Sequence, residues 1–186
     1  MIRLLTQLPR SITVAFSGGI DSVAAVDFLR RSHVITCAFF HHRTENSTKA
    51  HQFVTQFCEE RNLPLVVGIL NKEKPKTKSM EEHWRDERYK FFDNFGTVVT
   101  AHHLDDCIET YLFSTMHGEP KLIPMIRKNV VRPFLTTPKL EFFNWVMRKD
   151  LPFCHDTSND DDKYKRNYIR KHVVPQAYMV NHVELS

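Results

Sequence analysis

The sequence of 186 residues contains no pair of closely spaced cysteines. Zinc, iron–sulfur and dithiol sites commonly use a Cys-x-x-Cys pair, so these sites are excluded as sequence motifs. Isolated cysteines in a cytoplasmic protein are most simply reduced, buried side chains. The four cysteines are Cys37, Cys58, Cys107 and Cys154.

Long apolar runs are also missing. No stretch approaches the roughly 20 apolar residues that a membrane-spanning helix needs. The first ten residues contain Arg3, Pro9 and Arg10, and they lack the apolar core of a signal peptide. We therefore expect a cytoplasmic protein with no membrane partner.

A Walker loop is absent too, because no Gly-Lys-Ser/Thr follows a glycine-rich turn at the required spacing. Instead, the β-branched run at 12–16 leads directly into Ser-Gly-Gly, and a helical pattern begins at once. Glycines let the backbone approach a ligand closely, and the N–H groups of a new helix attract anions. The turn therefore predicts a phosphate site. Its candidate residues are Ser17, Gly18, Gly19, Asp21 and Ser22.

Apolar periodicity alternates between strand and helix along the first two thirds of the chain. Strands are expected at 12–16, 34–40, 65–70 and 97–101, and helices at 21–31, 49–61, 80–94 and 104–116. This alternation predicts an α/β fold, a Rossmann-like parallel sheet with helices on both faces.

After Gly118 the pattern changes. We expect a strand at 130–134, a helix at 139–149, a polar loop at 156–163 and a short basic helix at 167–172, closed by Pro175. We interpret 1–186 as one domain and 121–186 as a basic, partly helical C-terminal extension that packs on it. Residues 121–172 hold twelve Lys or Arg against six Asp or Glu, which suits either a phosphate-backbone partner or a solvated surface.

A second group of polar residues, at 101–110, also lies between an expected strand and an expected helix. Because the carboxyl ends of parallel strands meet at one edge, this group and the glycine turn should face the same crevice. Asp106 and Glu109 are three residues apart and share a helix face. An acidic Asp21 beside a phosphate makes sense if Mg²⁺ lies between them.

Over residues 12–176 the sequence resembles the tRNA(Ile)-lysidine synthetases, which are PP-loop ATP pyrophosphatases. The glycine turn alone indicates that superfamily, and the last two of the following strings single out the lysidine enzymes. The strings are Phe40-His41-His42, Met80-Glu81-Glu82 through Arg85, Arg88 and Tyr89, His102-His103-Leu104-Asp105-Asp106 with Glu109-Thr110, Arg132-Pro133-Phe134-Leu135, Asp156-Thr157-Ser158-Asn159 and Arg166-Asn167-Tyr168-Ile169-Arg170.

The resemblance implies an enzyme that uses ATP and Mg²⁺ to adenylate the wobble cytidine of an isoleucine tRNA with a CAU anticodon, and then attaches L-lysine. By resemblance, Asp21 holds Mg²⁺ near the phosphates. Asp106 and Glu109 hold the lysine amine and take its proton, and His102 orients nearby groups. The implied substrate-binding residues are Arg85, Arg88, Arg166 and Arg170.

The sequence departs from the family pattern where 117–120 replaces a glycine-rich stretch, and where Arg43 replaces a glycine. Family members also carry further C-terminal domains that hold tRNA. We expect a protein partner or oligomer to replace them here, or recognition of an anticodon stem–loop alone. Alternative functions are tRNA thiolation, ligation on a small molecule, and non-catalytic binding of nucleotide or RNA.

Overall fold

A computed structural model describes residues 1–71, 73–154 and 168–176, and it centres on a six-stranded sheet of order β3-β2-β1-β4-β6-β5. Five strands are parallel, and β5 pairs with β6 in the antiparallel direction. The strands are β1 (Ser11–Ala15), β2 (Val34–His41), β3 (Leu65–Ile69), β4 (Val98–Val99), β5 (Ile126–Arg127) and β6 (Val130–Val131).

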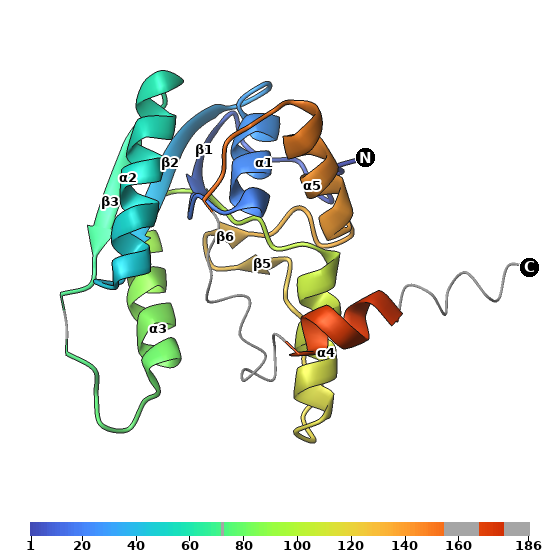
Figure 1. Ribbon diagram of the computed structural model, residues 1–186. Helices are drawn as coiled ribbons and strands as arrows, with labels where there is room; N and C mark the ends of the chain where they lie inside the picture. The colour runs from blue at the N-terminus through green and yellow to red at the C-terminus, as the bar shows by residue number, and fades with distance from the viewer. Residues whose placement is uncertain (72, 155–167, 177–186) are drawn as a thin grey trace, which may run out of the picture.

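Helices cover both faces of the sheet, so the predicted α/β fold is confirmed (Figure 1). Figure 1 shows α5 beside α1, and the red η2 segment crossing α4. The helices are α1 (Ile20–Leu29), α2 (Glu45–Glu60), α3 (Met80–Phe92), α4 (Leu104–Thr115), α5 (Lys139–Arg148) and the π-helical η2 (Ile169–Val173).

Side chains of β1 point alternately to the two faces of the sheet, and the core therefore has two layers. Val14 and Phe16 pack in a large cluster with buried residues of α1, α2 and α5, such as Phe142. Ala15 points to the other face, where it packs against a smaller cluster that includes Phe92 of α3. Residues one apart on a strand face opposite sides of the sheet, which explains this division.

The chain reverses its direction of winding between β3 and β4, so β1 has β2 on one side and β4 on the other. In open parallel sheets, ligands bind in the crevice at such a reversal, outside the carboxyl ends of the strands. Helices α1 and α4 both begin at this edge, directly after β1 and β4. The fold therefore brings the two polar sequence groups to one crevice, as expected.

Several predicted boundaries are wrong, and the strand expected at 97–101 is only Val98–Val99. The helix expected at 49–61 begins at Glu45, because the Thr44 side chain accepts a hydrogen bond from Ser47 N and caps it. The strand expected at 130–134 is shortened to two residues, and a hairpin partner, β5, precedes it. Beyond it, Phe134 forms a single parallel bridge with His103.

The basic helix expected at 167–172 is present in part. Residue 167 lies outside the described residues, and helical backbone runs from 168 to 176, past Pro175. A proline removes one helical hydrogen bond, and here the helix does not stop before it. Within the described ranges, no helix is long and apolar enough to cross a membrane.

Candidate active site

The glycine turn has a backbone that requires glycine at its first Gly position. Gly18 has a φ of +82°, and a Cβ there would lie 2.8 Å from the Phe53 ring. Within the turn, the Ser17 hydroxyl donates to Ser22 Oγ at 3.2 Å, and Ser22 Oγ donates to Gly19 O at 2.8 Å. These contacts hold the turn in one conformation before any ligand arrives.

Helix α1 begins without a side-chain cap, since its N-cap residue is Gly19. Its first intrahelical bond runs from Val23 N to Gly19 O at 3.0 Å. The N–H groups of residues 20–22 precede that bond and have no acceptor within the helix. Such N–H groups and the helix dipole attract anions, so we call the start of α1, at the end of β1, the predicted anion site.

Asp21 lies in the first turn of α1, and its two carboxylate oxygens differ, because one contacts positively charged side chains and the other has no partner within the described residues. Its Oδ2 is 3.5 Å from His103 Nε2 and 3.9 Å from Lys139 Nζ. Its Oδ1 is buried and has no hydrogen-bond partner within the described residues. Burial alone raises the pKa of Asp21, but the hydrogen bond to His103 and the charges of His103 and Lys139 lower it below the ordinary value. Asp21 is therefore a carboxylate with a free buried oxygen beside the anion site.

His103 connects the two polar groups. It is 3% exposed, and its Nδ1 lies 3.4 Å from Asp106 Oδ2 and 3.8 Å from Asp105 Oδ2. Burial lowers the pKa of His103, but the hydrogen bond to Asp21 and the charge of Asp106 raise it further, to above the ordinary value. His103 thus lies buried between carboxylates of α1 and α4, which favour its protonated form.

Two of those carboxylates also cap helices. Asp106 Oδ2 accepts from His103 N at 2.9 Å at the start of α4, and Asp105 Oδ2 accepts from Lys139 N at 2.8 Å at the start of α5. Each carboxylate satisfies an N–H that the first turn leaves open. The positions of Asp105 and Asp106 relative to Asp21 are therefore fixed by the starts of α1, α4 and α5.

His102, the histidine selected from the sequence, faces the α3 side of the sheet edge. It forms a hydrogen bond of 2.8 Å with Thr100 Oγ1. Burial lowers the pKa of His102 to about 4, and the charges of Arg132 and Arg88 add to this effect while Asp106 opposes it. His102 is therefore neutral at physiological pH, and it does not contact Asp21.

Glu109 forms an ion pair with Arg170, which lies 61 positions away in the sequence. Arg170 Nε and Nη2 donate to Glu109 Oε2 at 2.9 and 2.6 Å, and Glu109 is 3% exposed. Glu109 follows Asp106 by one turn of α4, as the spacing predicted. The structure thus joins a predicted amine-binding residue to a predicted substrate-binding residue.

The other three arginines differ in environment. Arg85 is exposed, with Cζ 5.8 Å from the Tyr89 ring centroid. Arg88 is half-buried and has no hydrogen-bond or ion-pair partner in the described part of the chain. Burial lowers the pKa of Arg88. Arg166 lies outside the described residues.

The donor set fits Mg²⁺ held together with a phosphate ligand. In the described ranges, no group of three or more His, Cys, Asp or Glu side chains is arranged to hold a metal by itself. Mg²⁺ is usually held by one or two carboxylates together with substrate phosphates and water. The open Oδ1 of Asp21, beside the anion site of α1, supplies such a carboxylate.

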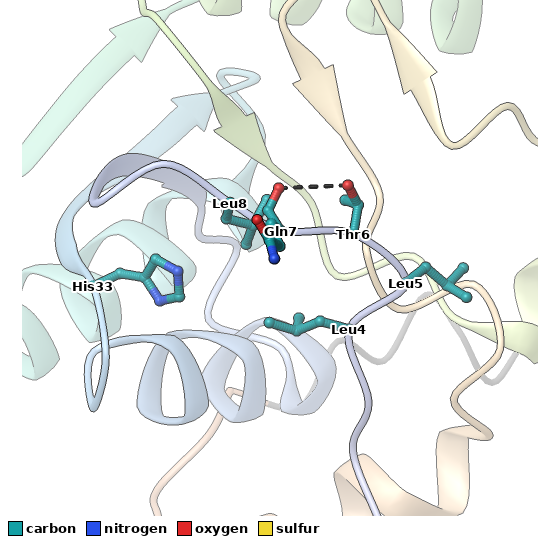
Figure 2. A pocket seen from close by; sticks show the side chains of 6 residues that line it. All are labelled: Leu4, Leu5, Thr6, Gln7, Leu8 and His33. Carbon is teal, nitrogen blue, oxygen red and sulfur yellow. Dashed lines mark hydrogen bonds between the residues drawn. The ribbon is translucent and has the colours of Figure 1, made fainter.

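An open cavity of about 530 Å³ lies elsewhere, lined by residues 4–8 and His33 (Figure 2). These residues directly precede β1 and β2, so the cavity is at the amino ends of the parallel strands. The glycine turn is at the opposite edge. The lining of the cavity contains no carboxylate, Lys or Arg, so we assign the cavity no part in phosphate chemistry.

Comparison with known families agrees with this geometry. A family model described as the PP-loop domain matches residues 3–177. The chain belongs to the PP-loop family.

Several curated relatives of this PP-loop protein are about equally similar. It is 33% identical over 187 residues to the bifunctional protein TilS/HprT of Listeria innocua, covering 88% of this chain and 29% of that protein. It is 32% identical over 189 residues to the tRNA(Ile)-lysidine synthase of a Thermotoga species, covering 91% of this chain and 46% of that protein. The PP-loop chain therefore spans less than half the length of these relatives.

The same fold occurs in a solved NH3-dependent NAD synthetase from Campylobacter jejuni. The TM-score is 0.56 at 12% identity, with 89% of this chain and 78% of that chain covered. At this identity the likeness shows the PP-loop fold and nothing about the substrate.

Three residues of the site were not selected from the sequence. His103 stood inside the quoted motif, and its contact with Asp21 depends on which of two adjacent histidines faces α1. The extended backbone before α4 offered a signal, because neighbours on a strand point to opposite faces. Lys139 and Asp105 gave no such signal, since their contact joins segments 34 residues apart.

Proposed function

We propose that this PP-loop chain is an ATP-dependent, carbon–nitrogen-forming ligase that modifies an isoleucine tRNA. It adenylates the wobble cytidine of a CAU anticodon and then attaches L-lysine. The observation that carries the proposal is the open Oδ1 of Asp21, placed beside the anion site of α1 and facing the acidic start of α4. The similarity to proteins named tRNA(Ile)-lysidine synthase supports the choice of substrate.

In the first step, cytidine O2 attacks the α-phosphorus of ATP. The O2–phosphorus bond forms, the bond to the β-phosphate oxygen breaks, and pyrophosphate leaves. The N–H groups at the start of α1 bind phosphate oxygens, the Ser17 and Ser22 hydroxyls hold the turn that presents them, and Lys139 adds positive charge nearby. Asp21 would hold Mg²⁺, which neutralises phosphate charge when bound. His103 keeps Oδ2 of Asp21 occupied, so Oδ1 stays directed to the ligand.

In the second step, the lysine ε-amine attacks C2 of the adenylated cytidine. The C2–N bond forms, the C2–O2 bond breaks, and AMP leaves with that oxygen. The amine must lose a proton to act as a nucleophile. Asp106 and Glu109 lie one turn apart on α4 and provide carboxylates for the ammonium group and its proton. Neutral His102 offers hydrogen bonds and adds no charge.

The environment of Cys107 disfavours this cysteine as the sulfur carrier of the thiolation alternative, which leaves Cys154, whose N–H donates to Gly18 O at 2.8 Å. Burial and the negative charge of Asp106 raise the pKa of the Cys107 thiol to about 11. Its Sγ lies 3.8 Å from Leu135 O. A thiol must ionise to carry sulfur, and this one stays protonated at neutral pH. Cys37 and Cys58 are buried in the core, away from the crevice.

The test is incubation of the protein with Mg²⁺-ATP, radiolabelled lysine and an isoleucine tRNA with a CAU anticodon. We expect label in the RNA that requires ATP and is lost when the wobble cytidine is replaced by uridine. Pyrophosphate release without label would keep the adenylating chemistry and reject lysine as the nucleophile. Binding of ATP with no pyrophosphate release, for any RNA supplied, would support the non-catalytic alternative.

A further inference from the structure

Four arginines between α3 and the β5–β6 hairpin lack carboxylate partners. We call this set the arginine cluster, and its members are Arg85, Arg88, Arg127 and Arg132. No ion pair joins any of them to an acidic residue in the part of the chain that the structure describes. Guanidinium groups left without carboxylates in one place are available to an anionic ligand.

Tyr89 organises the cluster. Arg127 Cζ lies 4.8 Å from the Tyr89 ring centroid, and Arg85 Cζ lies 5.8 Å from it. Arg132 Nη2 donates to the Tyr89 hydroxyl at 2.7 Å. Contacts with an aromatic ring restrict a guanidinium group without neutralising it. The three side chains are therefore held around one ring with their charges intact.

Most acidic residues in and just after α3 are engaged by other groups, and the exception is Glu81, whose charge raises the pKa of Arg88. Three carboxylates on or just after the helix are paired with lysines, and a fourth, Glu82, closes the cap at Ser79. The lysine pairs are Lys78–Asp86, Lys90–Glu87 and Lys128–Asp93. Lysines therefore take three of these acids, and none of the four arginines forms an ion pair within the described residues.

Arg132 gives a second, independent sign of a ligand site. It is 2% exposed, and Nη1 and Nη2 donate to Pro124 O and to Tyr89. Its Nε is buried and has no partner within the described residues. A buried donor without an acceptor is destabilising, and a ligand that supplies the acceptor removes this cost.

The cluster runs from the surface towards the active site. Arg85 and Arg127 are exposed at its outer end. Arg88 and Arg132 lie at its inner end, where their charges act on His102. His102 immediately precedes the N-cap of α4. A ligand that occupied the whole cluster would therefore reach the acidic start of that helix.

We propose that the arginine cluster binds phosphodiester groups of the RNA strand next to the reacting nucleotide. Several guanidinium groups spread along a path suit a chain of phosphates, whereas one carboxylate needs a single bidentate arginine. This inference rests on the proposed function only in taking RNA as the substrate. It assigns the strand a track on the α3 side of the sheet, while ATP binds at α1.

The test measures the affinity of the apo protein for a labelled anticodon stem–loop RNA, without ATP or lysine. Arg127→Gln should weaken binding roughly 3- to 10-fold at low salt, because one phosphate contact is lost. It should also reduce the slope of log K against log salt by about 0.7. Arg127 is exposed, so we expect the variant to keep the fold, which its melting temperature checks.

Lys128→Gln is the matched control. Lys128 is the neighbouring residue, is also exposed and carries the same charge, but its Nζ is paired with Asp93 at 3.1 Å. We expect its affinity and salt slope to match those of the unsubstituted protein. Equal losses in the two variants would mean that bulk charge alone attracts RNA, and the arginine cluster would be rejected as a site.

A second arm identifies the anion. RNAs with one neutral methylphosphonate linkage should bind the unsubstituted protein more weakly, and at one linkage Arg127→Gln should be insensitive to the change. If poly-glutamate competes as well as RNA, the ligand is a carboxylate. If Arg127→Gln weakens ATP or pyrophosphate binding instead, the cluster belongs to the nucleotide. Either result overturns the proposal.

The two proposals fail in different ways. If the stem–loop binds through Arg127 but lysine is never incorporated, the RNA track stands and the ligase reaction is rejected. If lysine is incorporated while Arg127→Gln and Lys128→Gln bind RNA equally, the reaction stands and the track is rejected.

Discussion

At the scale of single residues, Asp21 has an environment that a capping residue does not need. A carboxylate in the first turn of a helix is often only a partner for the helix dipole. Here His103 and Lys139 engage one oxygen and leave the other buried without a partner. The oxygen without a partner, Oδ1, is the one that would bind a cation near a phosphate.

We predict that Asp21→Asn slows adenylation by roughly 10²- to 10³-fold, because the amide has one fewer anionic oxygen for transition-state charge. Pyrophosphate release in the presence of RNA measures this step. Glu45→Gln is the control, since it removes an exposed carboxylate from the first turn of α2. Unchanged pyrophosphate release by Asp21→Asn would rule out the metal-holding role.

His42 should make stability depend on pH. Burial lowers the pKa of His42 to about 4, and the charges of Arg88 and His41 add to this effect. The unfolded chain therefore takes up a proton between about pH 6.5 and 4, where the folded protein does not. Stability contributed by neutral His42 is complete above that range and is lost as the pH falls through it.

We predict that His42→Gln reduces this acid destabilisation by up to roughly 3 kcal/mol at pH 4. Urea unfolding of the variant and the unsubstituted protein at pH 7 and pH 4 measures the difference. The exposed His117 provides the control substitution, His117→Gln. Parallel stability–pH curves for all three proteins would contradict a half-buried, neutral His42.

At the scale of elements, the beginnings of helices build the site. Helices α1 and α4 start beside each other because β1 and β4 are neighbours in the sheet. Helix α5 joins them through Asp105, which accepts from Lys139 N at 2.8 Å. Because a carboxylate of α4 caps α5, the distance between the first turns of these two helices is fixed.

We predict that Asp105→Ala destabilises the protein by about 1 kcal/mol, the usual cost of losing a capping acceptor. Asp105→Asn keeps an acceptor oxygen and should recover most of that loss. Thermal unfolding of both variants makes the comparison. Equal melting temperatures for Ala and Asn would show that the contact with α5 adds no stability.

At the scale of the whole molecule, the segment around η2 is attached to α4 by charge. Arg170 donates two hydrogen bonds to buried Glu109, at 2.6 and 2.9 Å. Hydrogen bonds between charged groups are roughly twice as strong as neutral ones. The contact places a C-terminal segment directly over the proposed amine site.

We predict that Glu109→Gln increases hydrogen exchange in residues 169–173 and leaves β1 protected, because the charged pair becomes neutral on one side. Exchange followed by mass spectrometry measures both segments in one experiment. Asp93→Asn, which weakens the exposed pair with Lys128, is the control. Unchanged exchange in 169–173 would mean that Glu109 does not hold this segment.

Much of the fold follows from local patterns in the chain. Repeated βα alternation predicted the parallel sheet, because period-two and period-3.6 spacing of apolar residues depends only on near neighbours. The glycine turn was identifiable for a similar reason, since Gly18 adopts a φ of +82° that other residues avoid. The short β5 was not predicted, because two exposed residues carry no periodicity.

The sequence by itself therefore determined most of the elements, β5 excepted, and that two polar groups follow β1 and β4. Tertiary structure decided that His103, not His102, meets Asp21, and that Arg170 reaches Glu109. It also decided that Arg127 and Arg132 gather around Tyr89. Such contacts join residues tens of positions apart, and strand order and helix packing place them. The local spacing of residues carries no information about strand order or helix packing.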